Sequence, residues 1–254
     1  MKRQPETRRL RSRPRFQRRG VGTHRCFAHP HKGCYLGRFD IVLVHHRRLS
    51  VVYLLSQSQL NRRIRALEPE LKAFQRDLAA KLADGSEIYH ILDTTLIPAV
   101  VRVRACRKGL FAGQATFGRC VSKTEWVYGF KVALSVGPES VIMAFGLAEA
   151  NSDERPIGDF LITSHGHDTY LADKGFSSLE WERHWLKSYV ALVAATPQES
   201  ARRAWPEKAC RWAAGKRQII EGVIWQLKDC FGLERHRAKT LGGLLTRLAA
   251  KVAA

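Results

Sequence analysis

Two long β-rich runs on either side of a Gly-Pro turn constrain the fold of this chain more than any other feature. The runs are "WVYGFKVALSVG" and "SVIMAFGLAEA", and Gly137-Pro138 lies between them. Runs of β-branched and aromatic residues that flank a turn signal predict neighbouring antiparallel strands. A sheet is therefore expected, and the segments around it decide the fold class.

The segments before and after this pair alternate between strand and helix patterns. "EIYHILDTT" predicts an earlier strand that ends in Asp93, and "TYLADKGF" a short later strand that ends in Asp173. "SSLEWERHWLKS" then reads as a helix, "YVALVAAT" as a buried strand and "KRQIIEGVIWQLKDCFG" as another helix. Three strands in a row followed by this alternation predict an α/β fold, a mixed sheet with helices packed against it.

The last of these helices carries one carboxylate between two cations. At roughly 100° per residue, Arg217, Glu221 and Lys228 fall on a single ridge of the helix. The ridge borders an apolar stripe that faces a core; the stripe is made of Ile220, Val223, Ile224, Leu227 and Phe231. One interpretation is a salt-bridge ladder between Arg217 and Glu221, worth a few tenths of a kcal/mol.

A second interpretation makes Glu221 part of a metal site. Asp93 and Asp173 end their strands, and acids at strand ends beside a helix that carries Glu221 can converge on one site. Carboxylate oxygens suit Mg²⁺ or Mn²⁺, which bind phosphates at their remaining positions. Two such ions can hold the attacking and leaving oxygens of a phosphoryl transfer.

The charge of the chain favours a polyanionic partner. Lys and Arg number 43 against 23 Asp and Glu, which gives a formal net charge of +20. Such a field favours nucleic acid, and the alternative is a merely basic soluble protein. No apolar run approaches the roughly 18–20 residues that span a bilayer. Six scattered cysteines without a C-x-x-C pair read as reduced thiols, so a cytoplasmic protein is expected.

Residues 1–48 read unlike the rest of the chain. Nine Lys and Arg in the first twenty residues, without periodicity, predict a disordered segment or an electrostatic arm for phosphates, with an organellar transit peptide as the weaker option. The following "THRCFAHPHKGCY" has enough ligands for Zn²⁺, but their spacing matches no zinc motif; they are His24, Cys26, His29, His31 and Cys34.

Residues 49–85 predict a helical segment. Ser56 and Ser58 are candidate N-caps, and Pro69 divides the segment into two short helices. Its basic face either contacts DNA or is solvated; the residues of that face are Asn61, Arg62, Arg63 and Arg65.

From about residue 55 to its end, the chain resembles the DDE transposases of bacterial insertion sequences. That family has the signature Y-x2-R-x3-E-x6-K, and Arg217, Glu221 and Lys228 match its last three positions. Ala214 stands where the family has tyrosine. Asp93 in "ILDTTLIP" matches the first acid of the family, and Asp173 in "LADKGF" matches the second.

Three further segments carry the same resemblance. "YGFK", which ends at Lys131, matches a Y-G-[FY]-K motif on the second strand of the family's sheet. "ANSDERP" matches the loop after the third strand, and "LERHRAKTLGGLLTRLAAKVAA" resembles the closing helix. The resemblance implies that residues 86–254 form a ribonuclease H-like catalytic domain with a mixed sheet flanked by helices.

The resemblance also implies an enzyme and its partners. A DDE transposase is an endonuclease that cleaves double-stranded DNA at transposon ends and joins the freed 3′-hydroxyl to target DNA. Asp93, Asp173 and Glu221 would hold Mg²⁺ or Mn²⁺, as two ions. Phosphates would be held by Arg217, Lys228, Lys131 and Lys174. The resemblance allows a homodimer in the DNA complex.

Other interpretations stay open. Residues 1–48 do not read as the helical DNA-binding segment that family members carry, so a truncated or degenerate copy is one expectation, and an inactive remnant or a non-catalytic basic nucleic-acid-binding protein is the alternative function. "SHGHDTYLAD" suggests a zinc hydrolase through His165, His167 and Asp168, but no further histidine completes the H-x-H-x-D-H pattern of that class.

Overall fold

The computed structural model describes residues 56–83, 85, 88–100, 105, 109–120, 124–197 and 205–254. The basic arm 1–48 and the His/Cys segment 24–34 lie outside these residues, so both remain expectations.

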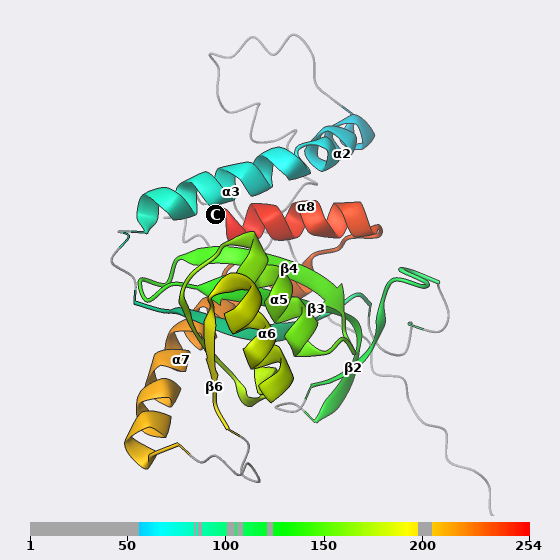
Figure 1. Cartoon of the computed structure of the whole chain (residues 1–254). Helices are drawn as coiled ribbons and strands as arrows, with labels where there is room; N and C mark the ends of the chain where they lie inside the picture. Colours follow the sequence, from blue (N-terminus) through cyan, green and yellow to red (C-terminus); the bar gives the residue numbers. More distant parts are fainter. Residues whose placement is uncertain are drawn as a thin grey trace, which may run out of the picture.

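A mixed six-stranded sheet forms the centre of the molecule (Figure 1). Its strands are β1 (His90–Pro98), β2 (Thr116–Cys120), β3 (Glu125–Val136), β4 (Ile142–Glu149), β5 (Thr169–Ala172) and β6 (Leu192–Ala195). The spatial order is β2-β3-β1-β5-β6, and β4 also pairs with β3. β1 is antiparallel to β3 and parallel to β5, which is parallel to β6. A three-stranded antiparallel part followed by parallel strands linked through helices is the ribonuclease H-like arrangement that the sequence predicted.

Helices cover both faces of this sheet. They are α2 (Gln57–Ala66), α3 (Glu68–Leu82), α5 (Glu154–Ser164), α6 (Leu179–Tyr189), α7 (Glu207–Asp229) and α8 (Leu241–Val252), with short 3-10 turns η1 (Lys174–Phe176) and η2 (Leu233–Arg235). Because successive side chains of a strand point to opposite faces, Ile91 and Leu92 belong to different cores. Ile91 packs with residues of α7 and α8, and Leu92 packs with residues of α5 and α6.

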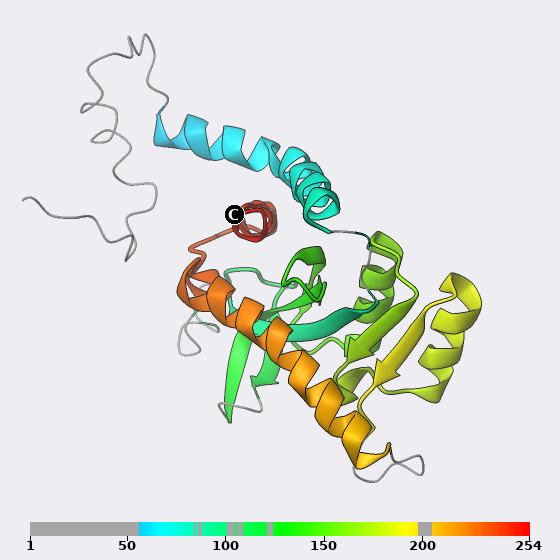
Figure 2. The same ribbon diagram turned by 90° about the vertical axis from the view of Figure 1, so that its left-hand side faces the viewer.

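The N-terminal helices match the sequence prediction. Ser56 accepts a hydrogen bond from the backbone N–H of Gln59, whose side chain in turn accepts one from the Ser56 N–H, so α2 begins with a capping box. Pro69 lies in the first turn of α3, where a proline fits. The two helices pack on α8 (Figures 1 and 2), and α3 also contacts the sheet, where Nε2 of Gln75 donates to the carbonyl of Ile142 on β4 at 2.6 Å.

Two elements were missing from the sequence prediction. β2 pairs with the first half of β3. "ANSDERP" was expected to be a loop, but the 11-residue helix α5 begins within it at Glu154, and the residues that follow up to Ser164 had no predicted structure. The "YVALVAAT" strand is also shorter than expected and forms an edge of the sheet, where Leu192 is 55% exposed.

Within the described residues, no helix is long and apolar enough to span a bilayer. Of the described cysteines, Cys210 and Cys230 are free thiols.

Candidate active site

Asp93 and Asp173 lie at the same level of neighbouring parallel strands. Asp173 follows the end of β5, but the predicted strand end at Asp93 is wrong, because pairing with β3 continues β1 to Pro98. Leu92 on β1 pairs with Ala172 on β5, and each aspartate is the next residue along its chain. By the alternation of side chains, Asp93 shares a face with Ile91, and Asp173 shares a face with Leu171. Both acids therefore lie on the face of the sheet that α7 covers.

Each aspartate folds back onto the amide that follows it. Oδ1 of Asp93 accepts a hydrogen bond from the N–H of Thr94 at 2.7 Å. Oδ1 of Asp173 accepts one from the N–H of Lys174, also at 2.7 Å, and caps the 3-10 turn η1. These bonds fix the direction of both carboxylates, and the Thr94 bond favours the ionised form of Asp93.

Arg217 links the acids of the strands to the acid of the helix. Its Nη1 lies 2.9 Å from Oδ1 of Asp173, and its Nη2 lies 3.9 Å from Oε1 of Glu221. The positive charge of Arg217 also acts on Asp93. The Arg217 side chain is 22% exposed, and its Nε is buried with no hydrogen-bond partner among the described residues. A single guanidinium therefore lies among all three acids that the sequence singled out.

Glu221 is the outermost of these acids. Its side chain is 59% exposed, one helical turn after Arg217 on α7. In the part of the chain that the structure describes, no three His, Cys, Asp or Glu side chains lie close enough to form a ready-made metal site. Asp93, Asp173 and Glu221 are thus joined through a cation, and their role as metal ligands stays a prediction.

The histidines of "SHGHDTYLAD", which suggested a zinc hydrolase, pack around a buried histidine. His167 lies with its ring 4.2 Å from that of buried His90, centroid to centroid, and His165 lies 5.5 Å from the same ring. Neither histidine belongs to a metal-binding cluster within the described residues. The pattern therefore forms a packed aromatic group at the start of β5.

Burial changes the acidity of Asp93. Removal of the carboxylate from water raises its pKa from 3.8 to about 6, and the negative charges of Asp173 and Glu154 act in the same direction. The Thr94 hydrogen bond and the charge of Arg217 oppose this shift. The site therefore holds a carboxylate that gains stability when a further cation approaches.

Glu154 is a site residue that the sequence prediction missed. It lies in the first turn of α5, where its Oε1 accepts a 2.8 Å hydrogen bond from the Thr94 hydroxyl. Its other carboxylate oxygen occupies the space beside Gly175: a Cβ on that glycine would lie 1.8 Å from it. Glu154 thus contacts the residue after Asp93 and the turn that follows Asp173. The sequence did carry a signal for a helix that starts at Glu154, because Asp153, directly before it, is a typical N-cap residue.

Lys131 on β3 binds the start of this helix. Its Nζ donates to the carbonyl of Ser152 at 2.7 Å and lies 3.5 Å from Oε1 of Glu154. The side chain is 13% exposed. Lys131 therefore anchors the start of α5 to β3, and its predicted contact with phosphate remains untested.

The other two predicted phosphate-binding lysines differ in their surroundings. Lys228 forms an ion pair with Glu234, with Nζ 3.2 Å from Oε1. Lys174 follows Asp173 directly and is exposed. Of the two, Lys174 lies next to the acids, whereas Lys228 lies seven residues beyond Glu221, roughly 10 Å along the helix.

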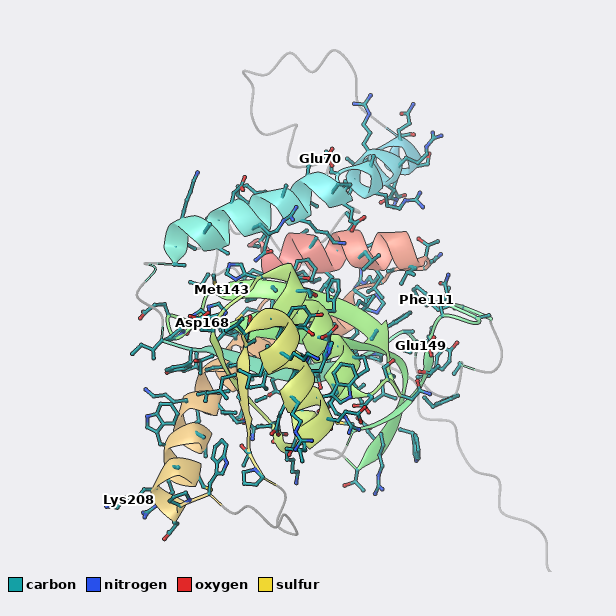
Figure 3. All side chains as sticks on the ribbon, in the orientation of Figure 1. Glu70, Phe111, Met143, Glu149, Asp168 and Lys208 are labelled. Atoms are coloured by element: carbon teal, nitrogen blue, oxygen red, sulfur yellow. The ribbon has the colours of Figure 1, made fainter. Side chains whose placement is uncertain are left out.

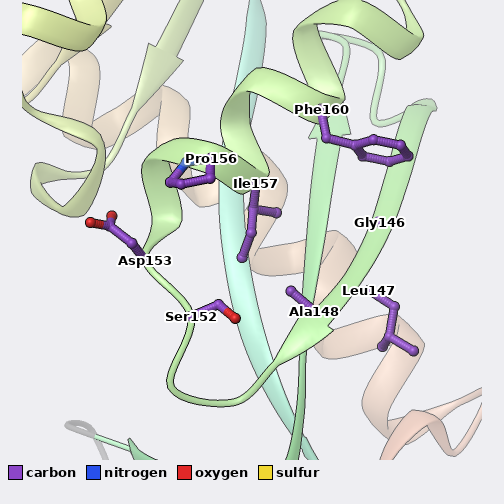
Figure 4. A pocket seen from close by; sticks show the side chains of 8 residues that line it. All are labelled: Gly146, Leu147, Ala148, Ser152, Asp153, Pro156, Ile157 and Phe160. Atoms are coloured by element: carbon purple, nitrogen blue, oxygen red, sulfur yellow. The ribbon is translucent and has the colours of Figure 1, made fainter. Parts of the chain in front are cut away.

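A hollow of about 430 Å³ lies away from these acids (Figure 4). It opens between β4 and α5, and the ring of Phe160 lies against Gly146 at its rim. None of the three acids lines it.

Comparison with known proteins gives the family. None of the curated proteins and none of the solved structures matches this chain. A family model described as the transposase DDE domain matches residues 83–241, a span that contains every strand of the sheet together with Asp93, Asp173 and Glu221. The chain belongs to the transposase DDE domain family.

Proposed function

We propose that this protein is a DNA transposase that cleaves phosphodiester bonds at the ends of an insertion sequence and joins them to target DNA. One observation carries the proposal: Asp93 within β1 and Asp173 at the end of β5 lie side by side on the face covered by α7, where Arg217 connects them to Glu221. These residues come from three distant parts of a chain that belongs to the DDE family.

The donors at this site fit hard divalent cations. Asp93, Asp173 and Glu221 offer only carboxylate oxygens, the ligands preferred by Mg²⁺ and Mn²⁺. Burial makes the ionised form of Asp93 unfavourable, so a nearby cation stabilises it. When bound, two such ions would activate the attacking hydroxyl and offset the charge that develops on the phosphate.

The residues of the chain then have separate roles. Asp93 and Asp173 are fixed by backbone hydrogen bonds and form the rigid part of the ligand set. Glu221 is exposed and completes the set by a movement of its side chain. Arg217 and Lys174 hold phosphate oxygens beside it, since Arg217 can exchange its carboxylate partners for a phosphate.

Nicking of supercoiled plasmid DNA by the purified full chain tests this function. We expect nicked product with Mg²⁺ or Mn²⁺ and none in EDTA. Asp93→Asn and Glu221→Gln should each reduce nicking by at least about a hundredfold, because each removes a carboxylate ligand of the ions that offset the charge on the reacting phosphate. Asp229→Asn, on the exposed side of the same helix, is the matched control and should nick normally. Nicking that persists in EDTA, or in both site variants, contradicts the proposal.

A second candidate is a transposase remnant that binds DNA without cutting it. Two observations favour it: Ala214 stands where the family signature has tyrosine, and the three acids do not form a ready-made metal site within the described residues. Tight DNA binding without nicking under any of these metal conditions would select this function.

A further inference from the structure

Cations gather where α2 meets α8. Arg65 lies in the last turn of α2, and Arg247 and Lys251 lie on α8. A Cβ on Gly243 would have Arg247 Nη1 at 3.2 Å and Arg65 Cδ at 3.8 Å, so both arginine side chains border the same glycine. We call Arg65, Arg247 and Lys251 the α2–α8 basic corner. Figure 2 shows the two helices passing each other at this point.

The hydrogen bonds of the basic corner leave its charge uncompensated. Nε of Arg65 donates to the carbonyl of Asn61 at 3.2 Å, and Nη1 of Arg247 donates to the carbonyl of Gly243 at 3.1 Å. Lys251 donates to two backbone carbonyls at the C-terminal end of α7; they belong to Phe231 and Gly232. All these acceptors are neutral. Among the described residues, no carboxylate forms an ion pair with the basic corner, whereas Arg217, Lys131 and Lys228 all have one.

The positive charges of the basic corner repel one another, Arg65 with Arg247 and Arg247 with Lys251. Burial lowers the pKa of Arg247, and the charge of Arg65 lowers it further. Burial likewise lowers the pKa of Lys251, and Arg247 adds to the effect. Like charges held together in a partly buried place destabilise the free protein. An anionic partner that binds there removes this repulsion.

The charges of the basic corner act on a histidine that is hydrogen-bonded to the strand that carries Asp93. Nε2 of His236 donates to the carbonyl of Pro98 at 2.9 Å, and its Nδ1 accepts from the N–H of Ala238. His236 is buried, and the charges of Arg247 and Lys251 reach it. Pro98 ends β1, five residues after Asp93, which is roughly 17 Å along a strand.

We infer that the α2–α8 basic corner binds the phosphate backbone of a DNA duplex whose scissile phosphate lies at the carboxylates. The inference rests on the proposed function and adds a docking surface remote from the chemistry. The corner offers donors and positive charge, which suit phosphate oxygens, and contacts of this kind position a duplex.

Salt dependence of DNA binding in EDTA tests the inference apart from cleavage. Arg65→Gln and Arg247→Gln each remove one phosphate contact, so each should reduce the slope of log K against log salt by about one. Arg65→Lys keeps the charge and should keep the slope. Arg183→Gln on α6 and Lys208→Gln, at the end of α7 remote from α8 (Figure 3), remove the same charge elsewhere and should leave the slope unchanged.

Urea unfolding distinguishes a role of Arg65 in DNA binding from a role in the stability of the fold. If Arg65 repels Arg247, urea unfolding of DNA-free Arg65→Gln at low salt should show stability equal to or above that of the wild type. Lower stability together with an unchanged slope would assign Arg65 a structural role and overturn the inference. An unchanged slope in both corner variants, or an equal loss in the controls, also overturns it. Plasmid nicking by the wild type in that case would leave the proposed function standing.

Discussion

Arg217 forms an ion pair with Asp173 across the gap between α7 and the end of β5, with Nη1 2.9 Å from Oδ1. The sequence prediction placed Arg217 beside phosphate and Asp173 on a metal. In the free protein the charges of these two side chains neutralise each other. The second terminal nitrogen of the same guanidinium, Nη2, lies 3.9 Å from Oε1 of Glu221. Arg217 therefore holds the acids together in the way that a divalent cation would.

Replacement of Arg217 should strengthen metal binding and weaken catalysis. Without this cation, Asp173 and Glu221 lose their counter-charge, so Arg217→Gln should bind Mn²⁺ about tenfold more tightly, roughly 1.4 kcal/mol. Nicking should fall, because no guanidinium remains to hold the phosphate. Calorimetric titration with Mn²⁺ measures the first effect and the plasmid assay the second.

Arg211 offers a matched control for this variant. It lies on the same helix and forms an ion pair with Glu207 at 3.5 Å, also four residues apart. Arg211→Gln should change neither metal affinity nor nicking. Equal Mn²⁺ affinity in wild type and Arg217→Gln would show that Arg217 does not compete with the metal.

The raised pKa of Asp93 predicts a pH-dependent stability. Its folded-state pKa is about 6 against an ordinary value of 3.8, so the folded protein holds this proton more tightly than the unfolded chain. Its stabilising contribution is present below about pH 4 and is lost as the pH rises to about 6. Relative to Asp93→Asn, the free energy of unfolding should fall by up to about 3 kcal/mol over this window. Urea titrations across the window measure it, and parallel curves for the two proteins would contradict the prediction.

Glu154 and Gly175 should be energetically coupled. A methyl group on Gly175 would displace the Glu154 carboxylate, which Thr94 and Lys131 hold in place. Gly175→Ala should therefore destabilise the wild type by about 1–2 kcal/mol, but cost little in a Glu154→Ala background. A double-mutant cycle by chemical denaturation measures the coupling. Gly166→Ala, at an open position before β5, is the control, and additive effects at Gly175 and Glu154 would show that the two do not touch.

Local periodicity was sufficient to predict most of the sheet and its flanking helices. The strands around Asp93 and Asp173, the hairpin about Gly137 and the stripe of α7 that begins at Ile220 all appear, because each pattern reports burial on one face. Phe231 was assigned to the same stripe, yet it is 38% exposed. The helix ends at Asp229, and the chain turns away before the stripe reaches Phe231.

The elements that the sequence did not predict depend on tertiary contacts. β2 is five residues long and exists through its pairing with β3; Gly118 is needed there because a Cβ would lie 2.5 Å from the carbonyl oxygen of Ala150. α5 buries Ile157, Leu161 and Ile162 against the sheet, a short helical pattern hidden among polar residues. The distance from Arg217 to the strand acids has no sequence signal at all, since it depends on how α7 crosses β1 and β5.

The glycine of the "YGFK" motif gives a final prediction. Gly129 lies on β3 between two partner strands, opposite Pro98 of β1 and Thr116 of β2. A Cβ there would lie 2.0 Å from the carbonyl oxygen of Ile97, a backbone atom that cannot move aside without breaking the ladder. Gly129→Ala should therefore lower the free energy of unfolding by about 3 kcal/mol.

Gly222 provides the opposite case for the same substitution. It lies inside α7, and a Cβ there meets nothing within 4 Å. Gly222→Ala should raise stability by up to about 1 kcal/mol, because alanine is the better helix former. Urea denaturation of both variants measures the two effects together. The contrast isolates backbone crowding at Gly129 from any general effect of an added methyl group, and a Gly129→Ala protein as stable as wild type would mean that β1 and β3 are not paired at Ile97.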